Sequence, residues 1–135
     1  MAVLRDETMD VRSTDDIIKA RRLVRDCAAT QGLSLVDQTK LVTAASELAR
    51  NTLLHGGGGT MHIQTVNRDG RRGVKAVFVD QGPGIVDIDQ AMKDGFSTGG
   101  GLGLGLGGAK RLVNEFDIRS EPGKGTAVTI VRWTP

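Results

Sequence analysis

Hydrophobic residues recur every three or four positions, which is helical spacing, in two segments of the N-terminal half. The first segment can be capped by Ser13 or Thr14 and is stopped by Gly32, and its apolar positions are Ile17, Ala20, Val24 and Ala28. The second opens with a capping-box-like S-x-x-D from Ser34 to Asp37 and ends before Gly56, and one face is marked by Leu41, Ala45, Leu48 and Thr52. The spacing predicts two consecutive amphipathic helices.

Four later segments have the alternating or continuously apolar, β-branched pattern of strands, and they are residues 61–66, 74–79, 116–120 and 126–133. Short turns join them in pairs, which predicts two hairpins. A short strand is also expected over 8–12, a short helix over 88–93, and a helix over about 105–115 after a Gly-rich loop. This order predicts an α+β fold, with helices on one face of a mixed, largely antiparallel sheet.

Composition narrows the function classes. The 135 residues suit one domain over 1–135, and 39% hydrophobic with 25% charged residues is typical of a globular chain. A net charge of +2 and 3% aromatic residues, without tyrosine, argue against nucleic-acid binding. A single cysteine, a charged N-terminus and no long apolar run predict a cytoplasmic protein that does not bind a membrane. The unusual feature of the composition is its high glycine content, with 19 glycines in the chain.

Three polar residues in the second helix could do chemistry. Glu47, Asn51 and His55 are spaced by four residues and therefore share one helical face, which we expect to oppose the apolar face. A carboxylate beside an amide suits proton transfer and a hard cation bound with a phosphate. A solvated helical face would show the same spacing, and His55 could either reach a phosphate or simply end the helix.

A second constellation follows the apolar strand that ends at Asp80. Gly82 and Gly84 come directly after it, in DQGPGI, and allow close approach of the backbone to another group. A buried carboxylate needs a hydrogen-bond donor, which the exocyclic amine of adenine would supply. An Asx-type turn, in which Asp80 bonds to its own loop, is the alternative.

The third constellation is the Gly-rich stretch from Gly95 to Leu112. Successive amides without Cβ atoms, leading into a helix, can cradle an anion such as phosphate. The stretch lacks the spacing of a Walker A loop, and its G-x-G-x-x-G before a helix is a weak dinucleotide signal because no strand directly precedes it. A turn, GKG, then leads into a strand that begins at Thr126.

In this order, ELARN, DQGPGI, the GxGxG lid and GKGTAV resemble the four sequence boxes of the GHKL (Bergerat-fold) ATP-binding superfamily, over about Ser46 to Ile130. The resemblance implies a two-layer α/β sandwich. The compact size looks like the anti-sigma-factor and switch-kinase branch of bacterial partner switching. No histidine precedes the first box in a dimerisation helix, so a histidine kinase that phosphorylates its own chain is not expected.

The resemblance also implies roles for individual residues. Glu47 matches the general base, Asn51 the Mg²⁺ ligand, and Asp80 the acid that binds adenine. The implied ATP-binding residues are Asn51, Asp80, Gly82, Gly84, Gly101, Leu102, Gly103, Leu104, Gly105, Leu106 and Thr126. Thr126 matches a hydroxyl that supports the Asp80 contact, and residues 101–106 match the lid whose amides hold the phosphates.

The function that the resemblance implies is that of a serine/threonine kinase. Such an enzyme would use Mg·ATP to phosphorylate a STAS-domain antagonist in a stressosome-like pathway, and would then act on a metal-dependent phosphatase or another regulator. The alternative is a binding module: an ATP-dependent anti-sigma factor that captures a sigma factor, or a phosphatase activator. In that case association, and not phosphotransfer, would be the output.

Overall fold

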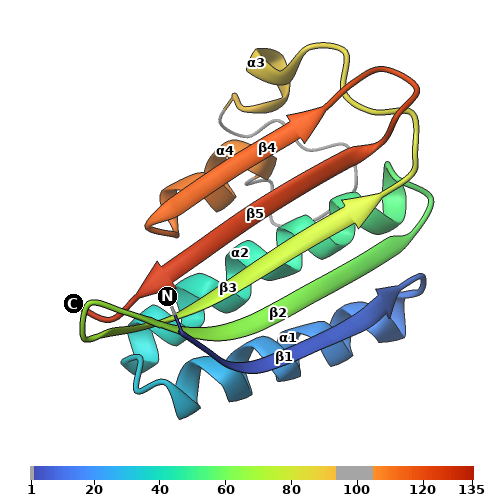
Figure 1. Cartoon of the computed structure of the whole chain (residues 1–135). Coiled ribbons are helices and arrows are strands. Elements are labelled where there is room, and N and C mark those ends of the chain that lie inside the picture. The colour runs from blue at the N-terminus through green and yellow to red at the C-terminus, as the bar shows by residue number, and fades with distance from the viewer. Residues whose placement is uncertain (1, 94–104) are drawn as a thin grey trace.

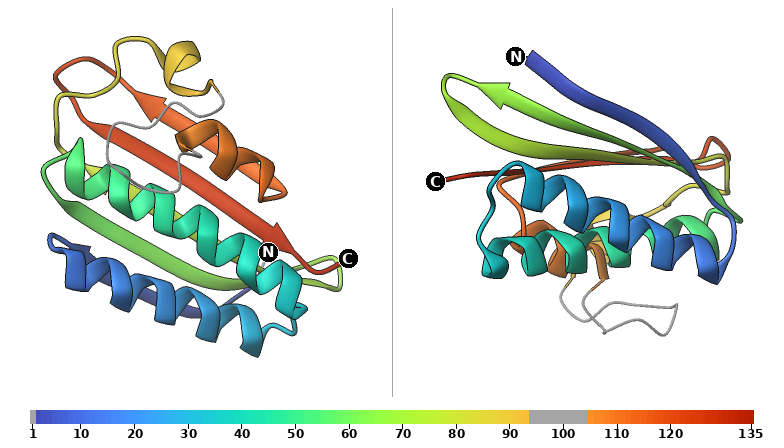
Figure 2. Two further views of the ribbon diagram at one scale, coloured as in Figure 1. Left: turned by 180° about the vertical axis from the view of Figure 1, so that it is seen from behind. Right: turned by 90° about the horizontal axis from the view of Figure 1, so that it is seen from below.

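Helices cover one face of a five-stranded sheet in the computed structural model, which describes residues 2–93 and 105–135 (Figure 1). The elements are β1 (Ala2–Val11), α1 (Thr14–Thr30), α2 (Leu35–Leu54), β2 (Gly59–Arg68), β3 (Arg71–Asp80), α3 (Ile88–Ala91), α4 (Gly105–Arg111), β4 (Glu115–Ser120) and β5 (Thr126–Trp133). The strand order is β1-β2-β3-β5-β4, and all four pairings are antiparallel. The view from below shows the sheet and helices as two layers (Figure 2). The predicted α+β class is confirmed.

Both predicted helix caps form. The Ser13 hydroxyl accepts a hydrogen bond from the amide of Asp16 at 3.2 Å, so Ser13 and not Thr14 is the cap of α1. At the start of α2, Ser34 accepts from the amide of Asp37 at 3.1 Å. Each cap satisfies an amide that the first helical turn leaves without a partner. The helix boundaries are therefore set locally, by a few polar residues.

The main core lies between the helices and the sheet. Its largest fully buried side chains come from α2 and the three central strands, and include Leu41, Leu48, Met61, Ile63, Phe78 and Ile130. A smaller cluster of Val66, Val131 and Trp133 is separate from this core. A Cβ on Gly73 would lie 2.5 Å from the Trp133 ring, so the indole packs directly on this glycine. Burial of both clusters favours the folded chain.

Two predicted boundaries are wrong. The first strand covers residues 2–11 and not only 8–12, because its pairing with β2 continues from Val11↔Gly59 to Ala2↔Asn67. Helix α4 ends at Arg111 and not near Glu115, because the amide of Asn114 already bonds to the carbonyl of Val131, at 2.9 Å.

Within residues 2–93 and 105–135, no helix is both long enough and apolar enough to cross a lipid bilayer.

One row of paired residues crosses the sheet near the end of β3. Gly59 pairs with Asp80, Asp80 with Thr126, and Thr126 with Ser120. Directly paired residues project on the same face of a sheet. The register therefore brings Asp80 and Thr126 side by side, although they are far apart in the sequence.

Candidate functional site

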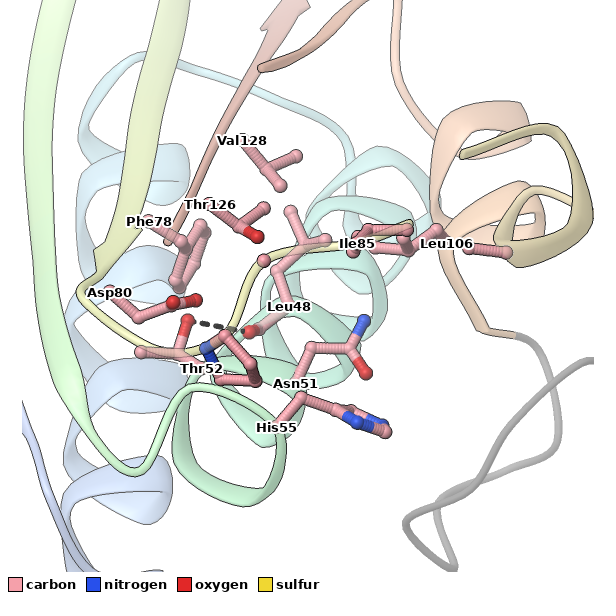
Figure 3. Close-up of a pocket in the computed structure, with 13 residues that line it drawn as sticks. Leu48, Asn51, Thr52, His55, Phe78, Asp80, Ile85, Leu106, Thr126 and Val128 are labelled. Atoms are coloured by element: carbon pink, nitrogen blue, oxygen red, sulfur yellow. Dashed lines mark hydrogen bonds between the residues drawn. The ribbon is translucent and has the colours of Figure 1, made fainter. Parts of the chain in front are cut away.

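A cavity of about 240 Å³ lies between α2, the sheet and the loop that follows β3 (Figure 3). Its lining residues are Leu48, Asn51, Thr52, His55, Phe78, Asp80, Pro83, Gly84, Ile85, Ala91, Leu106, Thr126 and Val128. Apolar side chains predominate, and a few polar ones are placed among them. This combination is typical of small-molecule sites, in which the apolar walls hold a ring and the polar groups fix its orientation.

The polar groups of the cavity come from both layers. Asp80 and Thr126 project from the sheet, and Asn51 and His55 project from the last turns of α2 (Figure 3). The Thr52 hydroxyl donates to the carbonyl of Leu48, at 3.0 Å, as threonine hydroxyls within a helix often donate to the carbonyl four residues earlier. The carboxylate therefore lies at one side of the cavity and the amide and imidazole at another.

Asp80 is the most constrained of these residues. Only 8% of it is exposed, and its Oδ1 accepts a hydrogen bond from the amide of Gly82 at 2.9 Å. This is the bond that an Asx-type turn requires, and the carboxylate nevertheless lines the cavity. An ionised carboxylate has about four acceptor positions, so one bond to its own loop leaves capacity for a ligand donor.

Glycines make the space around Asp80. A Cβ on Gly56 would lie 2.4 Å from both Cβ and Cγ of Asp80, and one on Gly125 would lie 2.2 Å from the Asp80 carbonyl oxygen. A Cβ on Gly82 would lie 2.6 Å from Cα of Gly56. Each distance is far below a normal contact, so side chains are excluded at these positions. The sequence reasoning assigned Gly82 but missed Gly56 and Gly125.

The loop after Asp80 is fastened to the turn between β4 and β5. Gly84 has a φ of +77°, and a Cβ there would lie 2.1 Å from the Glu121 carbonyl oxygen. The amide of Gly123 donates to the carbonyl of Pro83 at 2.6 Å. Glycine at position 84 therefore permits both the left-handed backbone conformation and the close approach of the Glu121 carbonyl. These contacts hold the loop against the sheet, where it forms one wall of the cavity.

The residues of α2 do not lie as expected. The spacing predicted a polar face opposite Leu48, but Asn51 and His55 line the same cavity as Leu48. At 3.6 residues per turn, positions 51, 52 and 55 all flank position 48, so this is the same side of the helix. Glu47 is 4% exposed and is not among the lining residues. It lies one turn before Asn51 and is buried, whereas a solvated face would expose it.

The structure describes only the last two residues, 105 and 106, of the predicted lid over residues 101–106. Gly105 begins α4 and is buried, and Leu106 lines the cavity with 6% of its surface exposed. Gly101, Leu102, Gly103 and Leu104 lie outside the described residues. The fold thus brings together Asn51, Asp80, Gly84, Leu106 and Thr126 from separate elements. The apolar walls, among them Phe78, Ile85 and Val128, were not predicted, since their patterns are those of ordinary core residues.

The chain is similar to known proteins over most of its length. The family model of the histidine kinase-, DNA gyrase B- and HSP90-like ATPases (HATPase_c) matches residues 36–134, which include every described element of the cavity. The chain belongs to this family. Within the HATPase_c match lie all four sequence motifs that suggested the superfamily, and the predicted membership is therefore confirmed.

Two kinds of curated HATPase_c relative are similar to the chain. One is the serine/threonine-protein kinase RsbT of Bacillus subtilis (strain 168), 49% identical over 118 residues, which are 87% of this chain and 89% of the relative. The other kind is represented by the anti-sigma F factor of Thermoanaerobacter sp. (strain X514). It is 29% identical over 119 residues, which are 84% of this chain and 82% of that protein. The branch suggested by the motifs is thus confirmed.

Solved structures show the same fold. The RsbU and RsbW domains of Rv1364c from Mycobacterium tuberculosis match with a TM-score of 0.64 and 22% identity, over 98% of this chain. The chain spans only 34% of that longer protein. The mycobacterial sensor histidine kinase MprB matches with a TM-score of 0.55 and 21% identity, over 96% of this chain and 97% of that one. At these identities the likeness supports the two-layer fold.

Proposed function

We propose that the protein is a serine/threonine kinase that uses Mg·ATP. The observation that carries this proposal is the 49% identity to a serine/threonine-protein kinase, which extends over 87% of the chain. The anti-sigma factors are less similar, at 29% identity. Fold alone would not support a choice, because one fold can carry several functions.

The cavity suits the adenine ring of ATP. Its apolar walls, which include Leu48, Phe78 and Val128, can hold a flat ring, and the Asp80 carboxylate can accept a hydrogen bond from the amine of the base. A carboxylate accepts and cannot donate, so it favours a base that presents an N–H group at this edge. Thr126, directly paired with Asp80, supplies a second polar group for the same edge.

Asn51 fits the magnesium ion that such a nucleotide carries. Among the described residues, no group of three histidine, cysteine, aspartate or glutamate side chains could hold a metal. Mg²⁺ is often bound by one or two protein oxygens together with phosphates and water. The Asn51 amide oxygen at the cavity would be such a ligand, and the ion would offset charge on the phosphates.

Glu47 is the proposed general base for phosphotransfer. It would accept the proton of the substrate hydroxyl as the hydroxyl oxygen bonds to the γ-phosphorus and the bond to ADP breaks. Glu47 lies one helical turn before Asn51, the proposed magnesium ligand, and the four-residue spacing places both on one side of α2. The Gly-rich residues 101–106 remain our proposed phosphate cradle, with amides that stabilise the developing charge.

The substrate that we propose is a serine or threonine of a STAS-domain protein. The naming of several relatives as anti-sigma factors supports a place in partner switching, where phosphorylation would release the kinase to bind a metal-dependent phosphatase. A sigma-binding module is the second candidate, and the 29% identical relatives favour it. Association without phosphotransfer would distinguish that candidate.

A basic groove between α1 and α2 suits a protein partner. It is lined by Ile18, Arg21, Arg22, Arg25 and Val42. Within the described part of the chain, none of the three guanidinium groups forms an ion pair. Unpaired arginines beside the exposed Ile18 fit a partner surface that combines carboxylates with apolar side chains. We propose this groove as the docking surface for the STAS-domain protein.

The test is transfer of γ-label from Mg·ATP to a STAS-domain protein encoded beside this chain. Wild type should label it, and Glu47→Gln should bind ATP normally but lose at least about 100-fold in rate, as expected for a general base. Glu7→Gln, on the exposed edge strand, is the matched control and should keep full activity. Tight ATP binding without transfer would overturn the kinase proposal in favour of the binding module.

A further inference from the structure

Arg50 has a guanidinium group without a partner in the described part of the protein. It lies on α2 directly before Asn51, and its Nε is buried and has no hydrogen-bond partner. Within residues 2–93 and 105–135, its guanidinium also forms no ion pair. Charged and polar groups that leave water are normally paired, because an unpaired one costs free energy.

Arg132 is the other residue of the described ranges with a buried Nε that lacks a partner, and its position has a structural reason. Its Nη1 donates to the carbonyl of Leu112 at 3.1 Å, and its Nη2 forms an ion pair with Asp37 at 2.8 Å. Arg132 thus joins β5 to α2 and to the chain just after α4. Arg50 makes no such contacts, so the fold does not account for its charge.

The position of Arg50 on α2 is next to the proposed catalytic residues. Glu47 is three residues earlier, and residues with this spacing are neighbours on a helix surface. In projection along the helix axis, Glu47 lies between Arg50 and Asn51, so the three residues follow one another around one side of α2. In the described part of the chain, Arg50 nevertheless does not pair with Glu47. Its guanidinium is therefore left for another anion.

We infer that Arg50 binds the terminal phosphate of ATP and so makes the site distinguish ATP from ADP. The inference rests on the proposed function, in which Asp80 holds the base and Asn51 the magnesium ion. These two residues lie at different sides of the cavity (Figure 3), so the phosphates lead from the sheet toward α2. The phosphate to be transferred must lie close to the general base, Glu47, and Arg50 is the neighbour of Glu47 on the helix surface.

A guanidinium group is chemically suited to this phosphate. The terminal phosphate carries up to about two negative charges near neutral pH. Arginine stays protonated and can donate two parallel hydrogen bonds to phosphate oxygens. ADP lacks this phosphate, so the contact of Arg50 would exist with ATP and be lost once the phosphate has been transferred. Arg50 would therefore favour ATP over the ADP product.

The test measures the Kd of Mg·ATP and of Mg·ADP by calorimetry, without a protein substrate. In Arg50→Met we expect the Kd for Mg·ATP to rise at least about 10-fold, because hydrogen bonds between charged groups are lost. The Kd for Mg·ADP should change less than about twofold. Methionine keeps an unbranched apolar stem and a high helix propensity, and no hydrogen bond within the described chain is removed, so the fold should persist. Arg50→Lys, which keeps the charge, should recover part of the affinity for Mg·ATP.

Lys40→Met is the matched control, because it also removes one positive charge from α2. Lys40 is exposed and lies about 15 Å from Arg50 along the helix axis. It should leave both dissociation constants unchanged. The inference is overturned if Arg50→Met binds Mg·ATP as tightly as wild type, or if it weakens both nucleotides by the same factor, as a merely structural role would. A wild type that binds neither nucleotide would instead overturn the proposed function.

Discussion

Gly56→Ala should damage the site through Asp80 without straining the backbone. The added Cβ would lie 2.4 Å from Cβ and Cγ of Asp80 and 2.7 Å from its Oδ2. An ordinary contact for a Cβ begins at 3.4 Å, so Asp80 or the end of α2 must move by about 1 Å. Gly56 does not have a positive φ, and alanine is compatible with its backbone conformation. The change therefore acts on the position of the carboxylate.

The expected loss of ATP affinity is set by the hydrogen bond that Asp80 would form. A shift of about 1 Å takes a hydrogen bond out of its favourable range of distance and angle. Hydrogen bonds to charged groups contribute about 1.5–3 kcal/mol, so the Kd for ATP should rise about 10-fold to 150-fold. Some stability should also be lost, because Gly82 packs against the backbone of Gly56.

The assay is nucleotide titration by calorimetry, with thermal unfolding measured on the same samples. Gly57→Ala is the control, since Gly57 has a φ of +74° and no atom within 4 Å of an added Cβ. It should cost about 1–2 kcal/mol of stability through backbone strain but leave the Kd near that of wild type. If Gly56→Ala folds and binds ATP as tightly as wild type, the carboxylate of Asp80 is not the acceptor for adenine.

Three further predictions concern the site, the partner surface and the edge strand. Asp80→Asn should raise the Kd for ATP by at least about 10-fold in the same titration, and an unchanged value would contradict a carboxylate acceptor. Arg22→Glu should weaken capture of the STAS-domain protein, and the defect should persist at low salt while the Kd for ATP stays unchanged. Equal capture by the wild type and by Arg22→Glu would exclude the groove as the docking surface. The pKa of Asp6 is lowered mainly by a hydrogen bond from His62 and further by one from Gln64. The Asp6 carboxylate therefore stabilises the folded chain at pH values above its ordinary pKa of about 4, and this contribution is lost as the pH falls through the lowered pKa. The difference in stability between wild type and Asp6→Asn should thus be present near neutral pH and shrink in acid, as measured by denaturant unfolding across pH.

Local features of the structure were predictable from the sequence. The caps at Ser13 and Ser34 depend on side chains within three residues of the amides that they accept from, so the pattern is visible in the sequence. Hairpins joined by short turns are equally local. The end of α4 was misplaced because it depends on a long-range contact, the bond from the Asn114 amide to the Val131 carbonyl. Periodicity alone does not report such a contact.

The sequence by itself determined the element types, the largely antiparallel character of the sheet and the order of the motifs that contain Glu47, Asn51 and Asp80. It could do so because these properties depend on residues close together in the chain. Only the tertiary structure decided that Asn51 lies beside Leu48 in an apolar cavity, and that Gly56 and Gly125 make room for Asp80. Strand register and the docking of α2 set these contacts between distant residues, since side-chain packing across layers has no signature in a single segment.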